Sequence, residues 1–398
     1  MAVVRPFRAI RPTSELADKV AALPYDVMNS EEARQMVVGN PYSFLHVDKA
    51  EIDLDPSIDH YDKKVYEKAR DNLNKMITDG VYIQDEKPCF YLYKQVMNGR
   101  PQVGIVGCAS IDDYMNNVIK KHELTRADKE EDRVNHVDYC NANTGPIFLT
   151  YKARGAINAI VEKTMAQAPV YDFVSDGVQN TVWVITDEAD IETIGKEFAA
   201  AGDLYIADGH HRCASAARVG KMRREQNPGY TGEEEFNYFL AVLFPDEQLY
   251  IMDYNRVVKD LNGLSDEEFM EKMKGMFHIK EYCGEGQYRP ESKHTFGMYL
   301  NDKWYILTAH GDIYDPNDPV DQLDVSILQY LILTRCHNGL GIPFYELQTF
   351  IRVWVPHTGQ FGPCFQQTVT DCIYMSMIQS NHTKPELPRC AHLLNNSL

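Results

Sequence analysis

The sequence lacks the features of a membrane-spanning or secreted protein. Its longest apolar runs, around Leu240 and Leu331, are shorter than the roughly 20 residues that a helix needs to cross a bilayer. The N-terminal stretch carries prolines and charges and has no apolar signal-peptide core. The nine cysteines are scattered and include no CxxC pair, which argues against a disulfide framework or a zinc ribbon. We therefore expect a cytoplasmic protein with reduced thiols and no membrane partner.

Several motifs of phosphate-binding enzymes are also absent. The sequence contains no GxxxxGKS, GxxxxGKT or GxGxxG pattern, which excludes a P-loop enzyme and a protein kinase, and it contains no HExxH or GxSxG pattern. Basic residues are few relative to acidic ones, 40 against 58, and the net charge is −18. Because binding to a phosphate backbone needs a basic face, we expect no nucleic-acid partner. A small anionic ligand in a locally basic pocket remains compatible with this charge.

The residues that are present are typical of a globular α/β chain. Apolar residues make up 44% and charged residues 25% of the 398 residues. Strand-like runs alternate with helical patterns, which predicts a mixed α/β fold with α+β character. The predicted helices span residues 60–80, 156–166, 190–201, 265–276 and 325–336. The predicted strands span residues 89–93, 103–106, 181–185, 204–207, 238–244, 249–253, 296–300 and 304–307, with a tight turn at Asn98-Gly99.

We expect three regions along the chain: an N-terminal α/β region over residues 1–150, an α/β core over residues 151–345, and a C-terminal tail over residues 346–398. The proline-containing segments 24–27 and 40–47 are predicted to be ordered loops that lead into strands. Ser43 and His46 in the second segment could line a cleft or only serve the local turn.

The sharpest local pattern is Asp208-Gly209-His210-His211-Arg212, between an apolar strand and a helical run. The free N–H groups at the start of a helix, together with the helix dipole, favour anions. Gly209 allows the backbone to approach a ligand, and Arg212 can donate to two phosphate oxygens. The alternative is that Asp208 only caps the helix and the histidines are structural. A metal site at His210 and His211 is less favoured, because adjacent residues at a helix start point in different directions.

The second pattern is a charged run over residues 118–136. Its cations would form a basic stripe on an acidic protein, and this local reversal of sign indicates an anionic ligand. The stripe comprises Lys120, His122, Arg126, Lys129 and Arg133. The alternative is a solvated helix carrying ion pairs between residues one turn apart.

A succession of short motifs runs along residues 1–345. They are Arg5-Pro6-Phe7, Pro24-Tyr25-Asp26-Val27, the run from Asn40 to Val47, Tyr91–Gln95, the run from Lys120 to Arg126, Lys129, Asp132-Arg133, Gly145-Pro146 and Ala207–Arg212. This succession resembles a widespread microbial family similar to free-serine kinases, some of whose members are pyrophosphate-dependent L-serine kinases. The turn at Asp208 also resembles the phosphate-binding turn of ADP-dependent free-serine kinases, which have a ParB/sulfiredoxin-like core. From about Phe350 onward the sequence departs from the family, whose members usually carry a Met-Pro-Pro-Lys segment there.

The resemblance implies that pyrophosphate phosphorylates free L-serine, giving O-phospho-L-serine and orthophosphate, on a ParB/sulfiredoxin-like core with elaborated N- and C-terminal regions. L-serine and pyrophosphate would be the partners, and Mg²⁺ would bridge donor oxygens, held by Asp208 or by the phosphates themselves. The phosphate-binding residues would be Gly209, His210, His211, Arg212, Lys120, Arg126, Lys129 and Arg133.

Glu123, Asp208 and Arg212 are the candidate catalytic residues. Glu123 is our choice for the base that accepts the proton of the acceptor hydroxyl, because flanking cations would keep it ionised. Asp26 is the reserve candidate for this role, and Asp26, Ser43 and His46 are candidate substrate-binding residues. Two alternatives remain open: an ADP- or ATP-dependent amino-acid kinase, and a ParB-like nucleotide-binding regulatory module without turnover.

Overall fold

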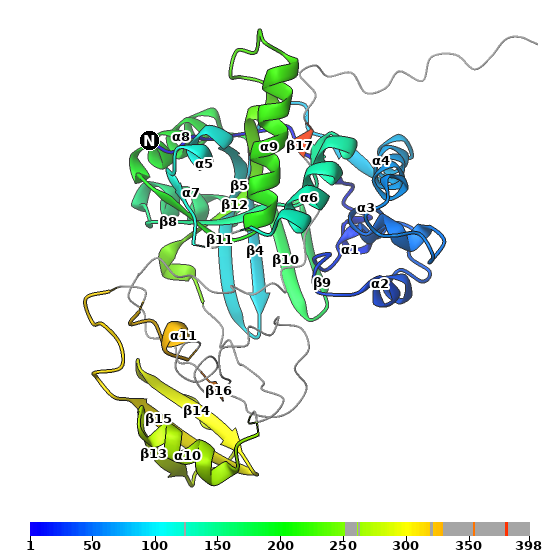
Figure 1. Ribbon diagram of the computed structural model, residues 1–398. Helices are drawn as coiled ribbons and strands as arrows, with labels where there is room; N and C mark the ends of the chain where they lie inside the picture. Colours follow the sequence, from blue (N-terminus) through cyan, green and yellow to red (C-terminus); the bar gives the residue numbers. More distant parts are fainter. Residues whose placement is uncertain are drawn as a thin grey trace, which may run out of the picture. The chain divides into compact units, whose positions relative to one another are not determined.

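The computed structural model describes residues 1–122, 125–250, 261, 263–318, 321–328, 353–354 and 379–380. The chain divides into two compact units (Figure 1). Unit 1 comprises residues 1–249 and 370–398, and unit 2 comprises residues 250–369. The boundary expected at residue 150 falls inside strand β8 (Ile147–Tyr151), which pairs with the later strands β11 and β12, and β12 in turn pairs with the earlier strand β5.

A large mixed sheet forms the centre of unit 1. Within the described residues it has nine strands, eight of them in the order β6-β11-β8-β12-β5-β4-β10-β9, while β1 (Val4–Arg5) pairs with the end of β5. The pairs β6–β11 and β8–β12 are parallel and the other pairs are antiparallel. This arrangement confirms the predicted mixed α/β class. The other strands are β4 (Phe90–Met97), β5 (Arg100–Ser110), β6 (Ile119–Lys120), β9 (Tyr171–Ser175), β10 (Val178–Ile185), β11 (Leu204–Asp208) and β12 (Tyr238–Pro245).

The tight turn between β4 and β5 is confirmed. Met97 pairs with Arg100 across it, and Asn98 and Gly99 have φ values of 52° and 78°. Positive φ at both central residues is the geometry for which Asn-Gly is favoured, because it matches the twist of the two strands.

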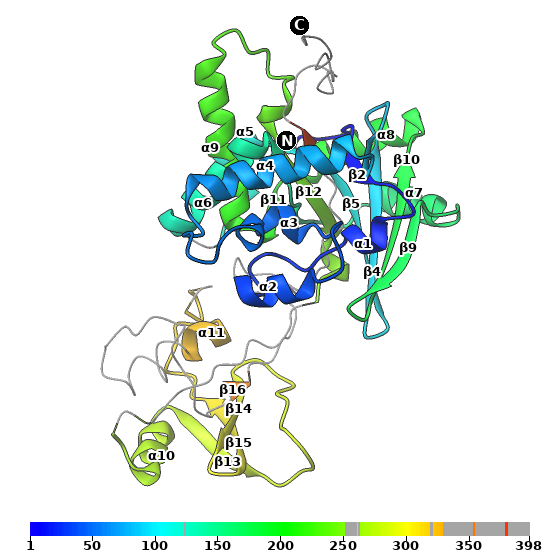
Figure 2. The same cartoon turned by 90° about the vertical axis from the view of Figure 1, so that its right-hand side faces the viewer.

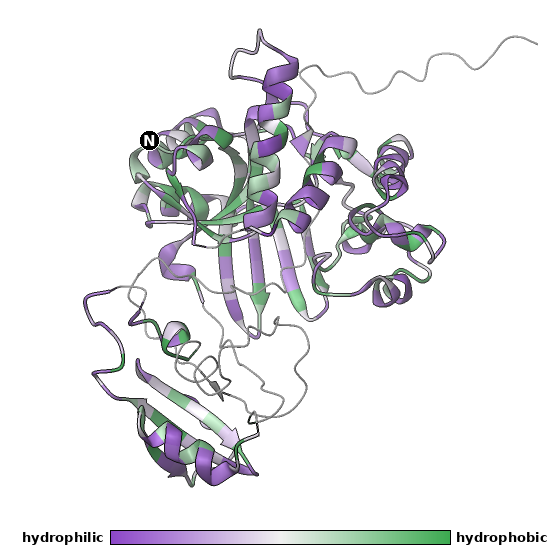
Figure 3. Ribbon diagram, in the orientation of Figure 1, coloured by the Kyte–Doolittle hydropathy of each residue, from purple (hydrophilic) through white to green (hydrophobic). Residues whose placement is uncertain are grey.

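Helices cover the sheet and pack beside it (Figures 1 and 2). Apolar side chains of α7, α8 and α9 belong to one core cluster with the sheet, which includes Ile157, Phe198 and Cys213. A second core cluster contains Phe7, Tyr91 and Phe148. Figure 3 shows apolar residues concentrated in the central strands and hydrophilic residues on the outer helix surfaces. The longer helices are α4 (Lys63–Thr78), α6 (Ala127–Cys140), α7 (Gly155–Met165), α8 (Glu188–Ala201) and α9 (His210–Gln226).

Short elements of the N-terminal region form a separate apolar cluster together with α4. The prediction that segments 24–27 and 40–47 lead into strands was wrong. Asn29 caps helix α2 (Ser30–Met36), and the second segment runs into helix α3 (Leu45–Asp48). The side chain of Asn40 accepts from the N–H of Tyr42, which begins a turn, and one helical turn then buries both Leu45 and Val47. The remaining short elements of unit 1 are α1 (Ala17–Val20), η1 (Ala50–Asp53), α5 (Ile111–Met115), η2 (Glu235–Asn237), η3 (Asp246–Gln248), β2 (Ile10–Pro12), β3 (Tyr82–Gln84), β7 (Ala142–Asn143) and β17 (Gln379–Ser380).

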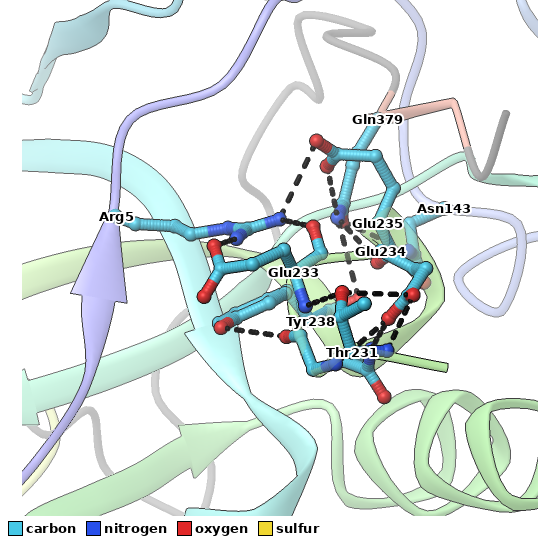
Figure 4. A network of polar contacts seen from close by, with 10 residues as sticks. Arg5, Asn143, Thr231, Glu233, Glu234, Glu235, Tyr238 and Gln379 are labelled. Carbon is cyan, nitrogen blue, oxygen red and sulfur yellow. Dashed lines mark hydrogen bonds and ion pairs between the residues drawn. The ribbon is translucent and has the colours of Figure 1, made fainter. Parts of the chain in front are cut away.

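A polar network ties distant parts of unit 1 together (Figure 4). The guanidinium of Arg5 lies 3.5 Å from the ring centroid of Tyr238 and donates to the carboxylates of Glu233 and Glu235. The side chain of Gln379 donates to the backbone oxygen of Glu235, at 3.1 Å, and accepts from Asn143, at 2.9 Å. These bonds join β1, the segment before β12, and the short pair β7–β17.

Unit 2 is an antiparallel sheet packed on short helices. The strands follow the order β13 (Phe277–Tyr282), β15 (Lys303–Ala309), β14 (Thr295–Leu300) and β16 (Val353–Trp354). Among its described residues the helices are α10 (Asp266–Lys274), which begins with a capping box of Ser265 and Glu268, and α11 (Asp324–Ile327). The predicted strands over residues 296–300 and 304–307 are confirmed, and they pair as a hairpin. Most of the predicted strand 249–253 and of the predicted helix 325–336 lies outside the described residues.

His46 joins α3, η1 and α4. Its Nδ1 lies 2.8 Å from Asp53 Oδ1 and its Nε2 lies 3.3 Å from the backbone oxygen of Asn40. Asn72 on α4 donates to both Asp53 Oδ2 and the His46 carbonyl oxygen. Because both ring nitrogens face acceptors, the protonated imidazole is favoured, and the hydrogen bond to Asp53 raises the pKa of His46.

Two helix-interior glycines provide a matched test of the packing. A Cβ at Gly220 in α9 would clash with the side chain of Ile111 and would lie 2.6 Å from the backbone oxygen of Phe236, whereas at Gly195 in α8 the nearest atom is 3.9 Å away. We expect Gly195→Ala to stabilise unit 1 by up to about 1 kcal/mol through helix propensity. Gly220→Ala should destabilise it by about 1–3 kcal/mol through overpacking. Urea unfolding measures both changes, and equal stability of the two variants would contradict this packing.

The His46 network predicts a pH dependence of stability. A histidine whose pKa is raised on folding contributes stability that is fully present below its unfolded pKa of about 6.5 and is lost as the pH rises through the folded value. The difference in the free energy of unfolding between wild type and His46→Gln should therefore shrink as the pH rises above about 6.5. The same difference for His60→Gln, a substitution at an exposed histidine outside this network, is measured as the control. If the difference in the free energy of unfolding between wild type and His46→Gln does not change with pH, a protonated His46 paired with Asp53 is ruled out.

Candidate functional site

The predicted strand–turn–helix unit forms as expected. Strand β11 ends at Asp208, Gly209 has a φ of 92° and a ψ of 33°, and α9 begins at His210. A Cβ at Gly209 would lie 3.3 Å from Nε of Arg212, so this guanidinium lies directly over the backbone of the turn. The left-handed conformation and the close approach both favour glycine at this position.

Asp208 and Arg212 form an ion pair across one turn of the helix. Arg212 Nη2 lies 3.0 Å from Asp208 Oδ2, and Nη1 donates to the backbone oxygen of Pro146 at 2.9 Å. The N-cap residue of α9 is Gly209, which has no side chain to cap the helix, and the carboxylate of Asp208 is the ion-pair partner of Arg212. Burial raises the pKa of Asp208, the charge of Arg212 opposes that shift, and the charge of Asp26 adds to it.

Arg133 on α6 is a buried cation with fixed orientation. Its Nε and Nη2 lie 2.9 Å and 2.8 Å from Asp132 Oδ2, and its guanidinium lies 4.0 Å from the ring centroid of Tyr25. The hydroxyl of Tyr66 on α4 donates to the other oxygen of Asp132 at 3.0 Å. A carboxylate at one edge and an aromatic ring on one face leave the guanidinium little freedom.

Asp48, the last residue of α3, reaches the other end of the same guanidinium. Arg133 Nη1 lies 3.4 Å and His136 Nε2 lies 3.6 Å from Asp48 Oδ1. Burial raises the pKa of Asp48, and the charges of Arg133 and Arg212 oppose this shift. Sequence reasoning missed Asp48. The motif considered there ends one residue earlier, at Val47, and the partner Arg133 is 85 residues away in the sequence.

The electrostatic surroundings of Tyr25 show that these groups belong together. Burial raises the pKa of this tyrosine to about 12, Arg133 and Arg212 act to lower it, and Asp26 and Asp48 act to raise it. We call this set the Asp208 cluster; its members are Tyr25, Asp26, Asp48, Asp132, Arg133, Asp208 and Arg212. Asp26 is exposed, whereas Asp132 and Arg133 are buried. Two arginines therefore face four carboxylates, and the cluster is not the basic pocket that the sequence suggested.

The histidines of the turn differ in their surroundings. His210 is buried and meets His122 edge to face, with ring centroids 4.3 Å apart. Burial, followed by the neighbouring histidines, lowers the pKa of His210 to about 3, so the ring is neutral at physiological pH. Within the part of the chain that the structure describes, Nδ1 of His211 is buried without a hydrogen-bond partner. A buried polar atom of this kind is available to a ligand at the start of α9.

The charged run folds as a half-buried helix instead of a solvated one. Residues 127–140 form α6, and three of its carboxylates pair with arginines of α9: Arg218 contacts Glu130 and Glu131, and Arg223 contacts Asp138. Of the predicted basic stripe, Arg133 is the member that joins the Asp208 cluster.

The other cations of the stripe have different partners. Lys120 Nζ lies 3.2 Å from the carboxylate of Asp203, which directly precedes β11. The turn at Asp208 is at the other end of that strand, so the Lys120 ammonium is roughly 15 Å from the turn. Arg126 pairs with Asp128 at 2.8 Å at the start of α6. Lys129, one helical turn before Arg133, lies 6.0 Å from the ring centroid of Tyr61.

The remaining predicted site residues are placed as follows. Ser43 is buried and its Oγ accepts from the N–H of Leu45, at 3.4 Å, in the turn before α3. His46 is engaged in the network with Asp53, which supports its structural role. Glu123 lies outside the described residues, although it follows His122 in the sequence and His122 contacts the turn.

Metal and membrane sites were assessed on the described residues. None of their His, Cys, Asp and Glu side chains form a group of three or more that could hold a metal ion. None of the helices among them is long and apolar enough to cross a membrane.

One of three comparisons with known proteins identifies a family for this chain. Searches of curated proteins and of solved structures returned no match, so the expected ParB/sulfiredoxin-like core stays a prediction. Residues 4–326 match the model of the family described as "Protein of unknown function (DUF1015)". Since the match covers most of the chain, this protein belongs to the DUF1015 family.

Proposed function

We propose that the protein transfers a phosphoryl group from pyrophosphate to the hydroxyl of free L-serine, with O-phospho-L-serine and orthophosphate as products. The observation that carries the proposal is the Asp208 cluster, where two oriented arginines, several carboxylates and the start of α9 come together. The resemblance to pyrophosphate-dependent serine kinases supplies the donor and the acceptor.

The residues of the cluster suit phosphoryl transfer. This reaction depends on aligning the donor and acceptor and on neutralising charge on the transferred group, more than on covalent chemistry by the protein. Arg212 and the first N–H groups of α9 would hold the transferred phosphoryl group, and His211 Nδ1 would interact with a donor oxygen. Arg133, fixed by Asp132 and Tyr25, would add charge at the second phosphate.

Magnesium is proposed to enter with the donor. Four carboxylates against two arginines disfavour a bare polyanion, and the described residues provide no cage for a resident metal ion. A Mg²⁺ ion that is already bound to pyrophosphate oxygens reduces the charge of the donor. Asp208 at the end of β11 is our candidate for a single protein contact to that ion.

A donor and acceptor screen tests the proposal. The purified chain is incubated with L-serine and magnesium pyrophosphate, ADP or ATP, and both O-phosphoserine and orthophosphate are measured, with serine omitted in a parallel set. We expect product from pyrophosphate only when serine is present. Activity with nucleotides alone would favour the ADP- or ATP-dependent kinase, and nucleotide binding without turnover would favour the regulatory module.

Arg212 should be essential for turnover. Loss of a preorganised donor to the transferred group costs on the order of 2–4 kcal/mol of transition-state stabilisation, so Arg212→Ala should lower kcat/KM by about 10²–10³-fold. Arg218→Ala is the matched control. It removes the same charge from the same helix, but the ion pairs that it breaks are those to Glu130 and Glu131 rather than the one to Asp208. Near-normal turnover of Arg212→Ala, or an equal loss of kcat/KM in Arg218→Ala, would show that the turn has no specific role in the reaction.

The base that accepts the hydroxyl proton is predicted to be Glu123. Glu123→Gln keeps the shape but removes the basic oxygen, so turnover should fall by roughly 10²–10⁴-fold while pyrophosphate binding persists. Asp26 is the alternative, since it is exposed and its charge acts on Asp208 and Asp48. An active Glu123→Gln enzyme beside an inactive Asp26→Asn enzyme would transfer the role to Asp26.

A further inference from the structure

Asp48 is the least expected member of the Asp208 cluster. Its carboxylate lies between α3 and α6, within 3.4 Å of Arg133 Nη1 and 3.6 Å of His136 Nε2. Arg133 already has a counter-charge in Asp132, at 2.8 Å and 2.9 Å. Asp48 is therefore a second carboxylate on one guanidinium, and the ion pair does not require it for charge balance.

The neighbour that could add positive charge to Asp48 does not do so. His136 is buried, donates to or accepts from Thr144 Oγ1 at 3.1 Å, and has a pKa well below its ordinary value because of burial and the charge of Arg133. A neutral imidazole leaves the charge of Asp48 to be balanced by Arg133 and, more distantly, by Arg212. Any anion that binds to these two arginines competes with Asp48.

We propose that Asp48 sets the anion selectivity of this site: its half-buried carboxylate disfavours a bare polyphosphate and favours one whose charge is already reduced by a bound divalent cation. The inference rests on the proposed function, because it takes the Asp208 cluster as the place where the donor phosphates bind. Asp48 acts on the donor through its charge and through the orientation of Arg133, so it is a positioning and selectivity residue rather than a catalytic one.

The effect is large enough to measure. Two unit charges separated by several ångströms at the effective dielectric of a partly buried site repel strongly enough to change an affinity by at least about tenfold. Removal of the Asp48 charge should therefore strengthen the binding of metal-free pyrophosphate by about tenfold or more. Binding of magnesium pyrophosphate should change less, because its net charge is lower.

The test compares pyrophosphate affinity in Mg²⁺ with that in EDTA by isothermal titration calorimetry on the full chain. For wild type we expect much tighter binding in Mg²⁺, and for Asp48→Asn this ratio should shrink at least about fivefold, mainly through the EDTA value. Asp138→Asn is the matched control, since it removes one carboxylate from α6 that pairs with an arginine of α9, at 2.7 Å, away from the cluster. Asp48→Glu, which restores the charge, should return the ratio toward that of wild type.

Each outcome bears on a different claim. No pyrophosphate binding by wild type in either condition would reject the proposed function itself. Binding by wild type with an unchanged ratio in Asp48→Asn, or the same change in Asp138→Asn, would overturn the role of Asp48 alone. If Asp48→Asn does not unfold cooperatively, Asp48→Ser, whose smaller side chain leaves room for water beside Arg133, is measured in its place. Failure of both variants to fold would assign Asp48 a purely structural role and overturn the inference.

Discussion

The fixed guanidinium of Arg133 is the interaction on which the candidate site depends. It connects α6 to the turn at Tyr25 and to the end of α3, and through Asp132 it reaches Tyr66 on α4. A buried arginine without partners would cost several kcal/mol, so the contacts of Arg133 favour the docking of these elements against one another. The short helices before α4 have small apolar faces, and this charge network supplies part of what orders them beside the sheet.

The parts of the fold that depend on local sequence could be predicted. The Asn98-Gly99 hairpin, the capping box at Ser265 and the strand–turn–helix at Gly209 are each encoded within a few consecutive residues. The strands expected after segments 24–27 and 40–47 do not form, and in the second segment the short apolar run fits a strand as well as a single helical turn. What selected the helical turn is burial against α4, which lies later in the chain.

Some residues of the candidate site could also be predicted from local sequence, and others could not. The strand–turn–helix unit from Asp208 to Arg212 could be predicted because it is encoded by consecutive residues. Arg133 was found as one cation in a run, but nothing in that run separates it from Lys120 or Arg126. The separation comes from depth, since the start of α6 is exposed whereas Arg133, further along, packs against Tyr25 and Asp48. Asp48 could not be found from spacing at all, because its meaning depends on a partner in another helix.

Charge balance connects the stability of the site to its proposed chemistry. The carboxylates that hold Arg133 and Arg212 in place are the groups that an anionic donor must compete with, so orientation of the arginines is gained at the expense of anion affinity. A site with fewer carboxylates would bind phosphate more tightly but would leave its arginines free to rotate. Phosphoryl transfer depends on the alignment of charge with the transferred group, and tight binding of the ground state adds nothing to the rate of the chemical step. An excess of carboxylates over arginines is therefore the arrangement expected of a site that orients a metal-complexed phosphate rather than one that stores free phosphate.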